Sequence, residues 1–226
     1  MTVLGIDTSG KTASVCIGDE EKIIAQTTVL TKLTHSQVIL PLTEKLLSDA
    51  DMSLSDIDVI AVADGPGSYT GLRIGIAAVK AMCFALSKKC IGISTLESLA
   101  YNCLPFVGTI VPLMKARADI AYFGVYESDG TRLTQLVDDC VLDINEISSI
   151  LKEYDNIILT GDYASECYNN HFSDDENIKL APVSQRLQLA SSLCIAAIEK
   201  KNALCEPDML EVNYLQITKA EKDLLK

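Results

Sequence analysis

The feature that most constrains the fold is a glycine-rich segment, Asp64–Gly71, with the sequence Asp-Gly-Pro-Gly-Ser-Tyr-Thr-Gly. The residues before it, Ile57–Ala63, form an apolar run that is typical of a strand buried on both faces. The residues after it, Leu72–Leu86, predict an unusually apolar helix. A buried strand, a glycine turn and a helix in this order indicate an α/β protein.

Three known loop types can be compared with this segment. A P-loop has Lys followed by Ser or Thr after its last glycine, whereas Leu72 and Arg73 follow here. A dinucleotide-binding loop has GxGxxG spacing, and this segment is one residue longer. A nucleophile elbow has the form GxSxG, and Ser68 lacks the correct flanking glycine. The segment fits none of the three.

Two interpretations of the loop remain. The glycines can allow a tight turn through their backbone freedom alone, or the amide groups at the helix N-terminus can bind an anion. The candidate residues for an anion site are Asp7, Thr8, Gly65, Gly67, Ser68 and Gly71. Asp7 is also the one candidate for a functional acid, and its alternative role is to cap the turn that follows the first strand.

The hydrophobic pattern predicts the element order βββαβα twice, with one further strand and helix after the first copy. In the first half these are Val3–Asp7, Ala13–Gly18, Ile23–Leu30, a helix over His35–Ser48 that Thr34 caps and Pro41 interrupts, Ile57–Ala63, Leu72–Leu86, Cys90–Ile93 and a helix to Cys103. In the second half they are Thr109–Met114, Ala121–Tyr126, Arg132–Val137, a helix from Asp143 to Glu153, Asn156–Thr160, Asp162–Asn170, a short strand Lys179–Ala181 and a long helix Ser184–Lys200.

The repeated order predicts two domains that face each other across a cleft. We expect the first domain at residues 1–105 and the second at residues 106–201. Residues 202–226 are expected to return to the first domain.

The helix Leu72–Leu86 carries only two charges, Arg73 and Lys80, which are seven residues apart and therefore share a face. A helix that is apolar almost all round is usually buried on more than one side. One side can pack on the sheet, and the other needs a partner. The helix near Val38–Leu47 also has apolar residues to spare, so we expect a contact between these helices and another subunit.

Composition narrows the possible partners and the compartment. The formal net charge of −12 makes direct binding of nucleic acid unfavourable, because phosphate contacts need clustered Lys and Arg. The eight cysteines have wide spacings without a CxxC pair, which favours free thiols in a reducing cytoplasm over a zinc site. No apolar run reaches the roughly 20 residues of a membrane-spanning helix, so we expect no membrane contact.

Three segments together resemble the bacterial TsaB (YeaZ) family: Leu4-Gly5-Ile6-Asp7-Thr8-Ser9, Gly65-Pro66-Gly67-Ser68-Tyr69-Thr70-Gly71-Leu72-Arg73-Ile74-Gly75 and Gly92-Ile93-Ser94-Thr95-Leu96. The family signature is a GPGSFTGxRxG run, from which this chain differs mainly by Tyr69 in place of Phe. Two further segments resemble less specific sequence motifs of the family: Met114-Lys115-Ala116-Arg117 and Val212-Asn213-Tyr214-Leu215.

The resemblance implies an actin-like/Hsp70-like ATPase (ASKHA) fold of two ribonuclease-H-like domains. It implies a non-catalytic subunit that binds and activates the catalytic paralogue TsaD in forming N6-threonylcarbamoyladenosine at tRNA position 37. A TsaE-like ATPase would join the complex, tRNA would be reached only through it, and the chain alone would form a homodimer. The implied partner interface lies on the helices near 35–48 and 72–86, with candidate residues Val38, Leu42, Leu46, Leu72, Arg73, Ile76, Val79, Lys80 and Cys83.

Catalysis by the chain alone is not expected. The catalytic paralogue carries paired histidines that hold a metal, whereas the corresponding stretch here, Ser94–Leu99, has none. The only histidines are His35 and His171, in different predicted domains, so we assign no catalytic residue, no metal site and no cofactor. The alternative is a stand-alone actin-like-fold enzyme that uses Asp7 and the glycine loop on a phosphorylated or nucleotide substrate.

Overall fold

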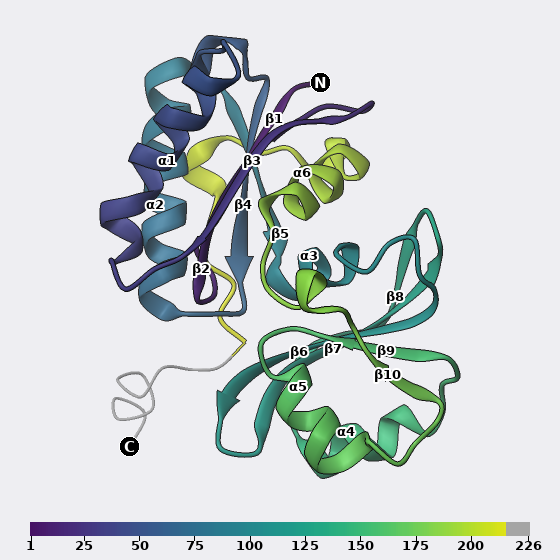
Figure 1. Ribbon diagram of the computed structural model, residues 1–226. Helices are drawn as coiled ribbons and strands as arrows, with labels where there is room; N and C mark the ends of the chain where they lie inside the picture. The colour runs from purple at the N-terminus through teal and green to yellow at the C-terminus, as the bar shows by residue number, and fades with distance from the viewer. Residues whose placement is uncertain (216–226) are drawn as a thin grey trace.

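The computed structural model describes residues 1–215 of the 226-residue chain and contains two five-stranded mixed sheets (Figure 1). The first sheet has the strand order β3-β2-β1-β4-β5, in which β1 pairs antiparallel with β2 and parallel with β4. Its strands are β1 (Val3–Asp7), β2 (Thr12–Gly18), β3 (Ile23–Leu30), β4 (Val59–Gly65) and β5 (Lys89–Ser94). The central strands β1 and β4 are almost wholly buried, as their continuous apolar runs predict.

Helices cover both faces of the first sheet. The helices α1 (His35–Asp49) and α2 (Tyr69–Leu86) pack on one face, and α6 (Ala190–Glu199) packs on the other. The helix α1 begins at His35 although Pro41 lies inside it, and the Thr34 amide donates to Gln37 Oε1 at 3.1 Å in a capping box. By length and composition alone α2 could cross a membrane, but its buried side chains pack in the core of the first domain.

The second sheet repeats the plan with the order β10-β9-β6-β7-β8. Its strands are β6 (Val107–Arg117), β7 (Ile120–Asp129), β8 (Leu133–Asp143), β9 (Ile157–Thr160) and β10 (Ile178–Leu180). One face is covered by α4 (Ile144–Leu151) and α5 (Ala164–Cys167), which a π-helical turn at Tyr168–Phe172 extends. The other face is covered by α3 (Thr95–Tyr101). Each of the two domains contains the βββαβα order that the sequence predicts.

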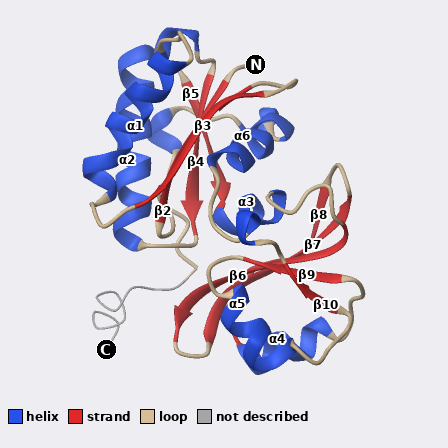
Figure 2. Ribbon diagram, in the orientation of Figure 1, coloured by secondary structure: helices blue, strands red, loops and turns tan. Residues whose placement is uncertain are grey.

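The helices α3 and α6 contact each other between the two sheets (Figure 2). The Ser192 hydroxyl on α6 donates to Asn102 Oδ1 at the end of α3, at 2.6 Å. The two domains therefore contact each other through a shared layer formed by α3 and α6, in addition to the covalent connections between them.

The prediction of a long helix over Ser184–Lys200 is wrong for its first six residues and for the domain on which the helix packs. A 3₁₀ turn at Val183–Gln185 and an extended stretch precede α6, because the Asn102 side chain donates to the carbonyls of Gln185 and Leu187 at 3.2 and 2.8 Å. The helix α6 then packs on β1 and β2 of the first sheet. The chain thus returns to the first domain before residue 190, earlier than the expected boundary at 202.

Residues 205–215 form a segment that we call the C-terminal strap (yellow in Figure 1). It begins with an antiparallel backbone bridge between Cys205 and Cys90, with N···O distances of 2.9 and 3.0 Å. It continues beside α2, and its Leu210 side chain is only 3% exposed in the core of the first domain. The strap belongs to residues 202–226, which we expect to return to the first domain, and residues 216–226 lie outside the described residues.

Candidate functional site

Asp7 ends β1 with its side chain fully buried. Its Oδ1 accepts hydrogen bonds from the Ser9 amide and hydroxyl at 2.9 and 2.6 Å, while Oδ2 has no partner among the described residues. Burial raises the pKa of this carboxyl, and the two bonds from Ser9 oppose the rise. Asp7 pairs with Ser14, whose hydroxyl accepts from the Ala190 amide, so the carboxyl lies on the α6 side of the sheet. The geometry is that of a carboxylate capping its own turn.

The glycine loop is packed tightly against the turn that follows β1. A Cβ atom on Gly67 would lie 2.4 Å from the Ser9 carbonyl oxygen, and one on Gly71 would lie 2.1 Å from the Thr8 carbonyl oxygen. The Thr8 hydroxyl donates to the Gly71 carbonyl at 2.7 Å, and the Ser68 amide donates to the Ser9 carbonyl at 2.7 Å. Only glycine permits this approach of one backbone to another.

Two of the amides that an anion would need are already engaged. The Ser68 amide is bonded to Ser9, and the Gly71 amide donates to Ser68 Oγ at 3.2 Å as part of the α2 cap. These bonds leave the loop fewer free donors than a phosphate-binding loop offers. They favour the structural interpretation, in which the loop fixes the start of α2.

A polar cavity of about 390 Å³ lies between the domains next to this loop. It is lined by Ser9, Gly10, Lys11, Gly67, Ser68, Met114, Lys115, Ala116, Tyr122 and Asp162. Of the residues expected to form an anion site, only Gly67 and Ser68 line this cavity. Lys11 and Lys115 also line it, but they were not among the expected site residues, because no local sequence pattern marks a side chain that faces a cleft. The Lys115 ammonium forms an ion pair with Glu166 at 2.7 Å, so part of the positive charge is already balanced.

The two histidines lie far from each other, on different elements. The His35 ring Nε2 is 3.1 Å from the Thr12 carbonyl oxygen and connects the start of α1 to β2. His171 is exposed on the π-helical turn after α5. Among residues 1–215 no group of three His, Cys, Asp or Glu side chains is placed to hold a metal ion.

A second carboxyl, that of Asp64, is partly buried near the end of β4, just before the loop. Its Oδ1 has no hydrogen-bond partner within the described structure, and a Cβ atom on Gly92 would lie 2.4 Å from its Oδ2. Burial, together with the negative charges of Asp139 and Glu97, raises the pKa of Asp64 to about 7. No local sequence pattern marks this raised pKa, because it depends on β5 packing against the Asp64 side chain.

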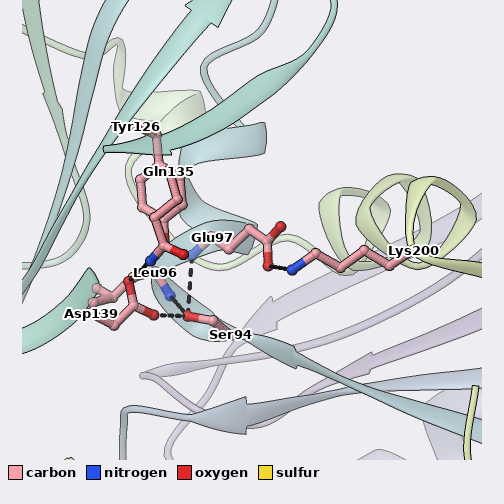
Figure 3. A network of polar contacts seen from close by, with 7 residues as sticks. All are labelled: Ser94, Leu96, Glu97, Tyr126, Gln135, Asp139 and Lys200. Carbon is pink, nitrogen blue, oxygen red and sulfur yellow. Dashed lines mark hydrogen bonds and ion pairs between the residues drawn. The ribbon is translucent and has the colours of Figure 1, made fainter. Parts of the chain in front are cut away.

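A polar network joins the first domain to the second (Figure 3). In addition to burial, the charges of two of its members, Asp139 and Glu97, raise the pKa of Asp64. Asp139 on β8 accepts hydrogen bonds from the Tyr126 hydroxyl at 2.6 Å, from Gln135 Nε2 at 3.1 Å and from the Ser94 hydroxyl. Ser94 ends β5, so its bond to Asp139 crosses between the domains. Burial raises the pKa of Asp139, and the bonds from Ser94 and Tyr126 limit the rise.

The same network includes the start of α3. Ser94 Oγ accepts from the amides of Leu96 and Glu97 at 3.1 and 3.3 Å and so caps this helix. Glu97 in turn forms an ion pair with Lys200, just beyond α6, at 2.5 Å. One serine therefore connects the helix cap, the second domain and the shared helical layer.

Most of the expected interface side chains lie inside the chain's own core. The exposed fraction is 8% or less for Val38, Leu46, Leu72, Ile76, Val79 and Cys83, and Leu42 is partly buried in the same core. These side chains face the sheet, so they cannot form the surface of α1 and α2. The large hydrophobic side chains of α1 and α2 that are exposed are Leu40, Tyr69, Phe84 and Leu86, at 52%, 44%, 61% and 37%.

Arg73 and Lys80, the two charged members of the expected set, contact the C-terminal strap. Arg73 Nε donates to the Tyr214 hydroxyl at 2.9 Å, and the Lys80 ammonium donates to the Asp208 carbonyl at 3.4 Å. On the other side of α2, a mainly apolar cavity of about 550 Å³ lies where Met82 meets α1 residues such as Leu47. The outward surface of α2 is therefore bordered by α1 and by the strap.

The chain was compared with known proteins and families. A family model described as "TsaD: tRNA N6-adenosine threonylcarbamoyltransferase" matches residues 23–210. The tRNA threonylcarbamoyladenosine biosynthesis protein TsaB of Bacillus subtilis (strain 168) is 33% identical over 223 residues, which are 98% of this chain and 96% of that protein. The chain belongs to the TsaB family.

A second relative carries the same name, and a solved structure shares the fold. The protein of the same name from Escherichia coli (strain K12) is 31% identical over 131 residues, 57% of this chain and 56% of that protein. A solved structure titled "YeaZ from Pseudomonas aeruginosa" has a TM-score of 0.79 at 24% identity and covers 95% of this chain and 99% of its own.

A more distant solved structure supports the fold alone. The (R)-2-hydroxyglutaryl-CoA dehydratase component A of Acidaminococcus fermentans has a TM-score of 0.51 at 14% identity, covering 89% of this chain and 99% of its own. The expected actin-like ATPase (ASKHA) fold of two ribonuclease-H-like domains is confirmed.

Proposed function

We propose that this TsaB-family chain acts in tRNA threonylcarbamoyladenosine biosynthesis as a non-catalytic subunit that binds and activates a TsaD-like catalytic paralogue. The observation that carries the proposal is the outward face of α2, where Ala77 and Ala81 are exposed beside Phe84. Small side chains let a second helix approach closely, and Phe84 offers apolar area at the edge of the contact.

The relation to the TsaD family supports this choice of partner. The TsaD family model matches residues 23–210, a range that contains α1 and α2, so a TsaD-like protein carries the counterparts of both helices. Two chains of one fold can pair through the same helices about an approximate two-fold axis, as the two halves of a symmetric dimer do. The same surface accounts for a homodimer of this chain when the paralogue is absent.

The proposed complex has further members. A TsaE-like ATPase joins it, and tRNA is held by the other subunits, in keeping with the net charge of −12 on this chain. The complex works in the cytoplasm, away from membranes. The alternative of a stand-alone enzyme in the interdomain cavity is not favoured by the TsaB assignment, and calorimetry with ATP and magnesium tests it directly.

The test is co-purification of this chain with the catalytic paralogue from the same organism. Ala81→Glu places a charge in the centre of the outward face of α2, and we expect it to abolish the complex. Ala203→Glu makes the same change at an exposed position after α6 and serves as the matched control. A complex that survives Ala81→Glu unchanged, or purified chain that modifies tRNA by itself, would show the proposal to be wrong.

A further inference from the structure

The C-terminal strap is held against α2 and the first sheet by contacts at both of its ends. Cys205 is paired with Cys90 through the backbone, and the Asn213 amide donates to the Asp64 carbonyl at 2.8 Å. Between them, Leu210 is buried in the core. Fixed points at both ends and in the middle make the strap part of the folded domain.

A three-residue stack fastens the last part of the strap to the first turns of α2. The rings of Tyr214 and Tyr69 are stacked with centroids 5.2 Å apart. The Arg73 guanidinium carbon lies 4.0 Å from the centre of the Tyr69 ring, while its Nε donates to the Tyr214 hydroxyl at 2.9 Å. Stacked rings with a cation over one face stabilise each other even at the surface.

The strap and α1 lie on opposite flanks of α2. The strap contacts Lys80, whereas the cavity against α1 is lined by Met82, and these two positions are about 200° apart around a helix. Ala77 and Ala81, both exposed, point between the two flanks. A groove of about 390 Å³ between Phe84 and the strap widens this surface at the C-terminal end of α2.

The outward face of the strap is acidic around one apolar residue. Met209 is 70% exposed, and Glu206, Asp208 and Glu211 are exposed on either side of it. Within the described part of the chain none of these three carboxylates takes part in an ion pair. An exposed methionine beside unpaired charges is a surface suited to an apolar partner element with basic residues at its edge.

We propose that the C-terminal strap is one wall of the partner-docking surface on α2, and that its occupant is an apolar helix of the catalytic paralogue with basic residues facing the strap. In this arrangement α2 forms the floor through Ala77 and Ala81, and α1 forms the opposite wall through Leu40. Met209 covers the helix from the side of the strap, and the carboxylates pair with its basic residues. The inference rests on the proposed function and adds the strap, with its charge preference, to the surface.

The strap also gives a reason for choosing the paralogue over a second copy of this chain. A second copy would bring its own acidic strap to the same contact, and like charges facing each other disfavour that pairing. A partner with basic residues at this edge gains instead. Tyr214 lies beyond residue 210, where the match to the TsaD family model ends, so the fastening stack is a feature in which the two proteins are expected to differ.

The test measures the dissociation constant between this chain and the purified catalytic paralogue by calorimetry at 50 mM and 500 mM salt. Glu211→Lys is expected to weaken binding about tenfold at low salt and less at high salt, because screening removes most of the charge effect. Met209→Ala is expected to weaken binding about tenfold at both salt concentrations. Glu176→Lys, an equal charge change on an exposed residue of the second domain, is the control and should bind as the unmodified chain does.

The outcomes separate this inference from the proposed function. If Ala81→Glu abolishes binding while Met209→Ala and Glu211→Lys bind normally, the strap is not part of the surface and the inference is overturned. If even Ala81→Glu binds normally, the proposed function itself is overturned. The side chains of Met209 and Glu211 are exposed, so neither substitution disturbs the core, and thermal midpoints equal to that of the unmodified chain confirm that a change in affinity is not a loss of folding.

Discussion

Replacing Asp64 by Asn should change how the stability of the protein depends on pH. Asp64 is partly buried near the end of β4, its buried Oδ1 has no partner among the described residues, and the pKa of its carboxyl is raised to about 7. A carboxyl whose pKa is higher in the folded state than in the unfolded state favours folding while it is protonated. That contribution is fully present below the unfolded pKa of about 3.8 and is lost as pH rises toward 7.

The size of the effect follows from the shift. Each pKa unit corresponds to about 1.4 kcal/mol, so the rise from 3.8 to about 7 amounts to about 4 kcal/mol once the group is fully ionised in both states. Between pH 5 and pH 8 the free energy of unfolding of the unmodified protein therefore falls by about 3 kcal/mol because of the Asp64 carboxyl. Asn cannot ionise and escapes the loss. Its unpaired amide hydrogens cost about 1 kcal/mol, but at every pH alike.

The assay is urea unfolding of both proteins at pH 5, 6, 7 and 8, with the free energy of unfolding extrapolated to water. The free energy of unfolding of the variant minus that of the unmodified protein should become more positive by about 3 kcal/mol from pH 5 to pH 8. This change is equivalent to roughly 6–12 °C in the thermal midpoint of a chain of this length. The buried carboxyl of Asp7, which is not among the charges that act on Asp64, titrates in both proteins and cancels in the difference. Parallel stability curves over this range would refute the assignment of a raised pKa to Asp64.

Three further predictions concern the loop, the shared helical layer and the thiols. Gly71→Ala should destabilise the protein by about 3 kcal/mol in urea unfolding, because the new Cβ would lie 2.1 Å from the Thr8 carbonyl oxygen. Asn102→Ala should cost about 2 kcal/mol by the same measurement and increase amide hydrogen exchange just before α6, since two backbone carbonyls there lose their donor. Ellman's reagent should react first with Cys140 and Cys205, the two partly exposed thiols of eight, and with the other six only on unfolding.

The local parts of the fold could be predicted from the sequence. Alternation of apolar residues and the positions of turn residues predict both βββαβα units, because strand and helix periods are properties of neighbouring residues. The start of α6 could not be predicted, since it depends on hydrogen bonds from Asn102, more than 80 residues earlier in the chain. The helical pattern around Ser184–Lys200 is broken by a distant side chain, and no local signal reports that.

The candidate interface shows the same limit in another form. Helical spacing identifies apolar residues on α2 but does not tell a residue facing the sheet from one facing a partner. Val79 and Phe84 are both apolar, yet Val79 is fully buried in the chain's own core and Phe84 is 61% exposed. Arg73 and Lys80 do share a face of α2, as their spacing indicates, but both of them bond to the strap. The strap's course along α2 is set by tertiary contacts and is invisible in the sequence pattern.

The placement of α6 on the first sheet has a consequence for synthesis of the protein on the ribosome. The sheet face formed by residues such as Val3 and Cys16 packs on α6, a helix that ends at residue 199. While the second domain is being translated, that face of the nascent chain is without its helix, although α1 and α2 have already emerged. The first domain is therefore completed only after the second domain has been made, and a chain that ends before residue 190 would leave this face of the first sheet without its helix.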